Sequence, residues 1–244
     1  PADMLPESVT GMLKNDKYQL LMVNSTYKVA TDKVNKQIEQ IDKIMDKYDK
    51  GAMLVGEGPL TKDLINITDT DFKRVSAVSI GIVFVIILLL FKSVTIPVIL
   101  VGVIEFAIFV NMGIPFYTGT KLPFVASIVI GTIQLGATVD YAILMTTRYQ
   151  RERSRGAGKF DAITTAHKFS AQSIIVSALS FFAATIGVGL YSNIDMISSL
   201  CILMARGALI SMVVVVLILP SLFMVFDKII VKTSKGFRPT GLKS

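Results

Sequence analysis

The chain has 244 residues, of which 52% are hydrophobic, and its mean hydropathy is +0.62. This composition is too apolar for an ordinary soluble domain and indicates a membrane protein. The formal net charge of +7 lies in segments beside apolar runs rather than along one folded face, which argues against nucleic acid as a partner. The single cysteine, Cys201, excludes a disulfide framework and a cysteine metal site.

Residues 1–72 carry charges throughout and are expected to form a small water-facing domain. Strand composition in Tyr18–Tyr27 and in Ala52–Gly56 flanks an amphipathic pattern that starts at Thr31, the expected N-cap of a helix. The order strand, helix, strand is a βαβ unit that is too small to be a complete domain. Lys62–Arg74 is predicted to be a helix that continues into the first membrane span.

Residues 73–226 form the predicted transmembrane helical domain. A span needs about 20 consecutive, mostly apolar residues to cross the hydrocarbon core, and five runs after residue 74 approach this length. They cover about residues 75–91, 94–112, 122–147, 171–191 and 196–226. A basic loop at residues 148–170 follows the third span, and a basic tail at residues 227–244 ends the chain.

The distribution of basic residues predicts the orientation in the membrane. The loop carries six Lys or Arg against two acids, and the tail carries five against one. Short basic segments mark the cytoplasmic side, and five spans then place the N-terminal domain outside. We therefore expect a multi-pass protein of the plasma or inner membrane. The chain does not begin with Met, and an external domain must be exported, so we expect it to be part of a longer polypeptide with an earlier span.

Three formal charges lie deep inside the predicted spans: Glu105, Asp140 and Arg206. Each costs at least about 2.5 kcal/mol when it faces lipid, so these side chains are expected to face protein or water and to mark a functional path. Two carboxyl groups and one guanidinium leave one negative charge uncompensated if all are ionised. The state with one protonated carboxyl has the lower free energy in a poor dielectric, and a buried carboxyl that gains and loses a proton in this way is typical of a proton carrier. Tyr141 is a proton-capable neighbour of Asp140.

Simpler structural roles are also open for these residues. Glu105 and Arg206 are candidate intramembrane charge partners, either as a static ion pair or as part of the proton path. Asp140 could instead hydrogen-bond to a neighbouring helix. Asp195 in the last external loop is expected to be solvated.

Five segments resemble the MMPL family of the resistance-nodulation-division (RND) superfamily. Their most specific element is the Asp-Tyr pair followed by an Arg-Tyr exit from the same span. The segments are Gly56–Leu64, Phe91–Leu100, Gly131–Leu144, Ala205–Met212 and Leu219–Ile229. The resemblance implies an external porter-subdomain fragment of α+β structure followed by spans two to six of one transporter half, with the C-terminal half favoured.

The resemblance also implies a function. It implies export of lipids or other lipophilic compounds driven by the proton-motive force, with Asp140 and Tyr141 as the proton relay. The relay would need a second pair from the other half, so the partners are a lipophilic substrate, protons, the other half and the lipid bilayer. A homo-oligomer is left open, and no cofactor is expected.

Two other functions remain as alternatives at this stage. One is a non-transporting scaffold that binds lipid or a partner, similar to a sterol-sensing module, and the other is a Sec-associated D/F type helper of protein export. An intramembrane aspartyl protease needs two catalytic aspartates in spans, and this chain has one. No phosphate-binding glycine loop is present, which argues against ATP as the energy source. We therefore expect a secondary active transporter and not an enzyme.

Overall fold

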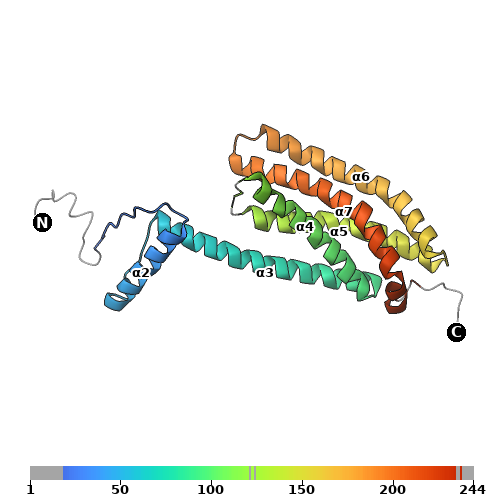
Figure 1. Cartoon of the computed structure of the whole chain (residues 1–244), viewed down its shortest axis with the longest axis horizontal. Coiled ribbons are helices and arrows are strands. Elements are labelled where there is room, and N and C mark those ends of the chain that lie inside the picture. Colours follow the sequence, from blue (N-terminus) through green and yellow to red (C-terminus); the bar gives the residue numbers. More distant parts are fainter. Residues whose placement is uncertain (1–18, 121, 124, 235–236, 238–244) are drawn as a thin grey trace, which may run out of the picture. The chain divides into compact units, whose positions relative to one another are not determined.

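The computed structural model describes residues 19–120, 122–123, 125–234 and 237. In this part of the chain the ordered elements are helices, and Figure 1 shows their arrangement. Five of them are long and apolar enough to cross a membrane, which confirms the predicted polytopic helical class. In chain order the helices are α2 (Asp32–Tyr48), α3 (Glu57–Phe91), α4 (Thr95–Thr118), α5 (Ala126–Ser154), α6 (Lys159–Tyr191) and α7 (Asp195–Thr233).

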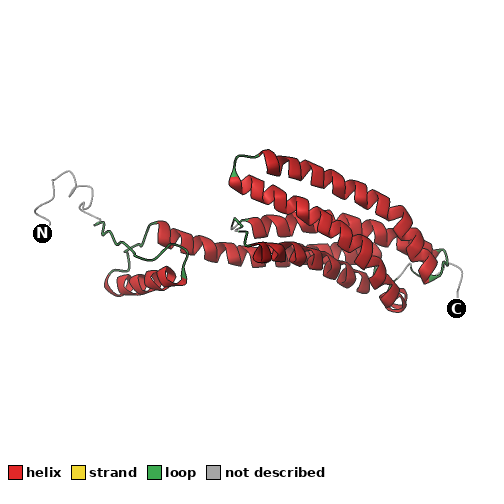
Figure 2. Cartoon of the chain, turned by 45° about the horizontal axis from the view of Figure 1, so that its top comes forward, coloured by secondary structure: helices red, strands yellow, loops and turns green. Residues whose placement is uncertain are grey.

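The predicted βαβ unit is not formed in the described residues. Figure 2 shows helix and loop there, and neither 19–27 nor 52–56 is a strand; Tyr18 and the residues before it lie outside the described part. Leu21 and Met53 are 77% and 80% exposed, so neither segment has an apolar surface to pack against. Strand composition does not suffice because an isolated strand pair is marginal without further strands or a covering helix.

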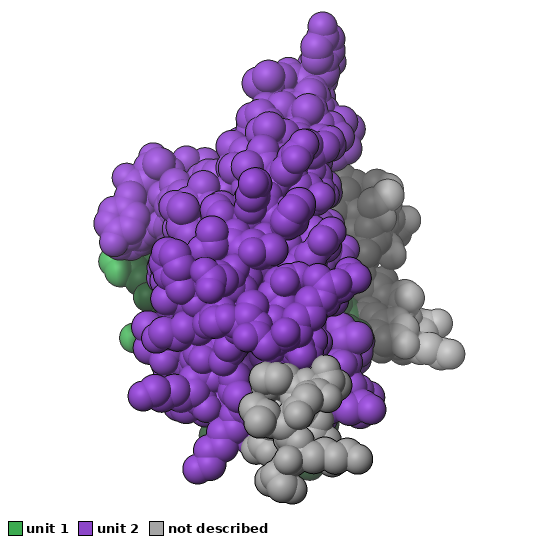
Figure 3. All heavy atoms as spheres, turned by 90° about the vertical axis from the view of Figure 1, so that its right-hand side faces the viewer, with its two compact units in different colours: residues 1–67 green, residues 68–244 purple. Residues whose placement is uncertain are grey.

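The helix between these segments forms as predicted. Thr31 is its N-cap, with its side chain accepting a hydrogen bond from the Val34 amide, and Val34 and Ile38 are buried. The chain divides into two compact units at a point within α3, residues 1–67 and residues 68–244 (Figure 3). The first unit contains α2 and the start of α3, and the second contains the rest of α3 and the helices α4 to α7.

Several helices run beyond the predicted span limits. α4 continues past Met112 through Pro115 to Thr118, and its C-cap is Gly119, whose φ of 65° is left-handed. α7 continues through Pro220 to Thr233, into the predicted tail. A helix satisfies its own backbone hydrogen bonds in water or lipid, so a polar composition alone does not end it.

The predicted basic loop at residues 148–170 is largely helical. α5 runs to Ser154 and α6 begins at Lys159, so only a short turn joins them. We refer to the end of the bundle that contains this turn and the end of α7 as the basic end, because Arg151, Arg153 and Lys232 lie in the last turns of α5 and α7.

Helix α7 organises the bundle because it packs against α4, α5 and α6. Figures 1 and 2 show α6 and α7 side by side. The two helices approach so closely at Gly189 that no side chain would fit there. A Cβ there would lie 2.9 Å from Ile202 Cγ1 and 3.2 Å from the Ile202 amide nitrogen. Small residues permit such close approach where no hydrophobic effect drives helices together. This packing holds α5, which carries Asp140, in a defined place.

Candidate functional site

Asp140 and Tyr141 lie near the middle of α5 but on different faces. Asp140 is exposed on the outside of this bundle, and no hydrogen bond or ion pair within the described residues involves its carboxylate. Tyr141 is 6% exposed and belongs to the main apolar core. Neighbouring residues of a helix point about 100° apart, so the core holds Tyr141 and presents Asp140 outward.

The face of α5 that carries Asp140 is open along its length. Ile133, Gly136 and Thr147 are exposed with Asp140 at the spacing of one helical face. We call these four residues the open face of α5. Asp140 lies eight residues before Arg148, about 12 Å along the helix. It is inside a helix that is long and apolar enough to cross a membrane, and nothing in the described chain covers its carboxylate.

Glu105 and Arg206 do not form the ion pair that was considered from the sequence. Ion pairs between described residues join Lys62 to Glu39, Lys73 to Asp69, Arg153 to Asp227 and Arg155 to Glu152. Glu105 is half-buried without a hydrogen-bond partner in the described part. Its side chain lines a cavity of about 340 Å³ formed by α3, α4 and α5, with Phe72 and Thr132 among the other lining residues.

Arg206 is bound by a neutral residue, Asn111 of α4. Its Nε donates to the side-chain oxygen of Asn111 at 2.8 Å, and its Nη2 donates to the backbone oxygen of Asn111 at 2.9 Å. That backbone oxygen is free to accept because residue 115, four positions later, is a proline and has no N–H. The proline in α4 thus helps to create the acceptor that holds the guanidinium.

The Asn111 side chain connects Arg206 to a buried polar network across α4, α5 and α7. Asn111 Nδ2 donates to Gln134 Oε1 at 2.8 Å, and Gln134 Nε2 donates to Ser211 Oγ at 3.1 Å. Thr138 Oγ1 donates to the same Ser211 oxygen at 2.7 Å. Asn111 and Thr138 are fully buried and Ser211 nearly so, and a satisfied network of this kind fixes how helices pack.

Gly207 makes room for the two amide side chains. A Cβ at this position would lie 2.7 Å from Asn111 Nδ2 and 2.8 Å from Gln134 Oε1. Any larger residue would push the amides apart. The network therefore depends on a glycine next to Arg206 as well as on the polar residues.

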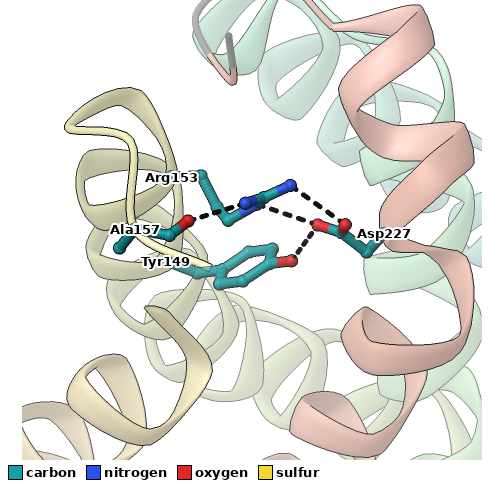
Figure 4. Close-up of polar contacts among 4 residues, drawn as sticks. All are labelled: Tyr149, Arg153, Ala157 and Asp227. Carbon is teal, nitrogen blue, oxygen red and sulfur yellow. Dashed lines mark hydrogen bonds and ion pairs between the residues drawn. The ribbon is translucent and has the colours of Figure 1, made fainter. Parts of the chain in front are cut away.

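A second polar cluster, shown in Figure 4, joins α5 to α7 at the basic end. Arg153 forms a two-point contact with Asp227, from Nε to Oδ1 and from Nη2 to Oδ2, both at 3.0 Å. Tyr149 donates its hydroxyl hydrogen to Asp227 Oδ1, and Arg153 Nη1 donates to the Ala157 carbonyl at 2.7 Å. Asp227 is 6% exposed and Tyr149 is fully buried, so the charges are compensated within the protein.

Aromatic packing surrounds this basic-end cluster. The Tyr149 ring stacks on Phe223, with ring centroids 5.0 Å apart and planes 8° apart, and Phe237 lies against it at 5.9 Å. The cluster was not predicted from the sequence, because Asp227 fell in the predicted basic tail and Arg153 in the predicted basic loop. The available signal was the four-residue spacing of Tyr149 and Arg153, which places both on one helical face.

The geometry defines a multi-pass helical membrane protein with ionisable side chains inside its spans. Within the described residues, no three His, Cys, Asp or Glu side chains gather where they could hold a metal ion. Arg206 and Asp227 are tied into polar clusters, whereas Asp140 and Glu105 are not. Ionisable side chains inside membrane-spanning segments face protein or water by default and mark candidate functional sites.

Comparison with known proteins agrees with this class. The model of the MMPL family matches residues 8–239, so the chain belongs to the MMPL family. YdgH of Bacillus subtilis, described by name as a membrane protein, is 25% identical over 186 residues, covering 72% of this chain and 20% of YdgH. The membrane protein SCO0839 of Streptomyces coelicolor is 28% identical over 118 residues, covering 47% of this chain and 16% of that protein.

The chain thus spans about a fifth, or less, of the length of these two relatives. Membership of the family indicates a membrane transporter-like module.

Proposed function

We propose that the chain is one half of a proton-motive-force-driven exporter of lipids or other lipophilic compounds. Asp140 takes up and releases the proton, and Tyr141 supports the relay from the core side of α5. The protein lies in the plasma or inner membrane with its basic end facing the cytoplasm. Residues 1–67 belong to the external porter region. The basic segments support this orientation through the positive-inside rule.

One observation carries the proposal: Asp140 is exposed on the open face of α5, inside a helix long and apolar enough to cross a membrane. A carboxylate facing lipid costs at least about 2.5 kcal/mol, and the described chain offers it no partner. The free energy is recovered if a second protein surface covers the open face and supplies polar partners. A second transporter half, carrying its own Asp-Tyr pair, is such a surface, and the carboxyl then gains or loses a proton as its partners change.

The small exposed residues of the open face support close docking. Gly136 has no atom within 4 Å of the position that a Cβ would take, and it lies one turn before Asp140. A glycine on an uncovered helical face allows another backbone to approach closely. The proton site would then lie between two halves instead of inside one.

The test is pH-gradient-driven efflux of a fluorescent lipid analogue by the complete protein in vesicles. Asp140→Asn removes the proton site and keeps the side-chain size, so efflux is expected to fall to background while insertion is unchanged. The matched control is Asp195→Asn, at an exposed aspartate in the first turn of α7. Unchanged efflux in Asp140→Asn overturns the proposal. Absence of efflux in the unaltered protein, with partner assembly intact, favours a non-transporting scaffold or an export helper.

A further inference from the structure

A groove between α4 and α7 opens on the outside of the bundle near the basic end. Its volume is about 480 Å³, and its walls run from Thr95 to Phe106 on α4 and from Ile218 to Ile229 on α7. Thr95 is the one lining residue with a polar side chain. Gly102 widens the α4 wall, since nothing lies within 4 Å of the position that its Cβ would take.

The length of the groove matches one leaflet of a bilayer. Each wall covers eleven residue steps, or about 16 Å at 1.5 Å per residue. The hydrocarbon core is about 30 Å thick, so the groove is about as long as one leaflet of the core is thick. An acyl chain of a single phospholipid has this reach, whereas a membrane-spanning helix of a partner would need an apolar surface along the whole core.

The outer end of the groove is polar and positively charged. Thr95 and Thr233 hydrogen-bond there through their side-chain oxygens at 2.8 Å, and the Ser234 hydroxyl donates to Ser93 Oγ at 2.6 Å. In the chain, Lys92 directly precedes Ser93 and Lys232 directly precedes Thr233, so both lysines adjoin residues that form these contacts. Both lysines are exposed, and neither forms an ion pair within the described residues.

We propose that this groove binds an anionic phospholipid from the leaflet at the basic end. One acyl chain fills the apolar groove, and the phosphate lies between Lys92 and Lys232 beside the Thr95 hydroxyl. Basic pockets between helices on one side of a membrane recognise anionic head groups in this way. The inference depends on the groove and its charges and is independent of any proton relay at Asp140.

The experiment uses a tryptophan reporter, because the chain contains no tryptophan. Leu222→Trp places the reporter in the α7 wall, and Leu179→Trp places a control on α6, at a side chain that is 47% exposed. The full chain is reconstituted in phosphatidylcholine vesicles with brominated phosphatidylglycerol or brominated phosphatidylcholine as quencher. The groove reporter is expected to prefer phosphatidylglycerol by about fivefold for each lysine, and the α6 control is expected to show no such preference.

Charge variants distinguish a built site from general attraction to the membrane surface. Lys92→Gln and Lys232→Gln are each expected to lower the preference about fivefold, whereas Lys168→Gln, at an exposed lysine of α6, is expected to leave it unchanged. Three outcomes overturn the proposal: equal quenching by the two lipids at Leu222→Trp, an equal effect of Lys168→Gln, or quenching by neither lipid. The last outcome means that protein covers the groove. Lysine substitutions at exposed positions are not expected to affect folding.

Discussion

Loss of the Asp227 carboxylate is expected to lower the free energy of unfolding of the bundle more than loss of an exposed ion pair does. In Asp227→Asn the guanidinium of Arg153 stays in place with its bond to the Ala157 carbonyl, but it loses the two-point contact with a charged partner. The side chains of Arg153 and Asp227 are only 18% and 9% exposed, so water replaces the lost contact poorly. The hydroxyl of Tyr149 also loses a charged acceptor.

The magnitude follows from these contacts. Removing one partner of a buried pair costs about 3–5 kcal/mol, because a buried charge is left uncompensated. Arg153 keeps one backbone acceptor and some exposure, which places the expected loss for Asp227→Asn near the lower value, about 3 kcal/mol. The exposed pair of Lys73 and Asp69, 72% and 60% exposed, is the matched comparison. Asp69→Asn is expected to cost under about 0.5 kcal/mol.

The assay is reversible unfolding of the chain in mixed micelles by SDS titration, followed by circular dichroism. A double-mutant cycle with Arg153→Gln measures the interaction energy of the pair. The double variant is expected to lose less free energy of unfolding than the two single variants lose in sum. A loss for Asp227→Asn that is as small as that for Asp69→Asn would refute the reasoning. Additive effects of Asp227→Asn and Arg153→Gln would also refute it.

Two further predictions concern the amide network and the orientation. In the same titration, Gly207→Ala is expected to lower the free energy of unfolding by about 1–3 kcal/mol, because the new methyl group overlaps both amides of the network. The control Gly187→Ala has open space around the new methyl group and is expected to cause no loss. Equal losses in the two variants would contradict the role of the network. The orientation is tested with single cysteines placed in a Cys201→Ser background. Lys168→Cys is expected to react with a membrane-impermeant maleimide only from the cytoplasmic side, and Lys43→Cys only from outside. The reverse pattern would contradict the orientation.

The five spans were predictable because each needs only a long apolar run, which composition reveals directly. Helix ends were predicted less well. The second span was predicted to end at about residue 112, but α4 continues to Thr118 and includes Pro115, whose missing N–H leaves a carbonyl that Arg206 uses. The strands around α2 were predicted from composition alone, and composition does not supply the neighbouring strands that a sheet needs.

The partners of the intramembrane charges could not be predicted from charge alone. Arg206 has a neutral partner, Asn111, on a helix 95 positions earlier in the chain, so a search for opposite charges paired it with Glu105 instead. Asp227 contacts Arg153 across 74 positions, and its place in a basic stretch concealed its burial. The role of Asp140 stays a prediction, and the residue was singled out because a lone carboxylate inside an apolar run is conspicuous without knowledge of any partner.

Proton flux through the complete protein tests the central claim most directly. The measurement follows a pH-sensitive dye inside proteoliposomes after an imposed pH gradient, with a fluorescent lipid analogue present. The unaltered protein is expected to dissipate the gradient, Asp140→Asn to show no flux above protein-free vesicles, and Asp195→Asn to behave as the unaltered protein. Full proton flux in Asp140→Asn would contradict the assignment of Asp140 as the proton site.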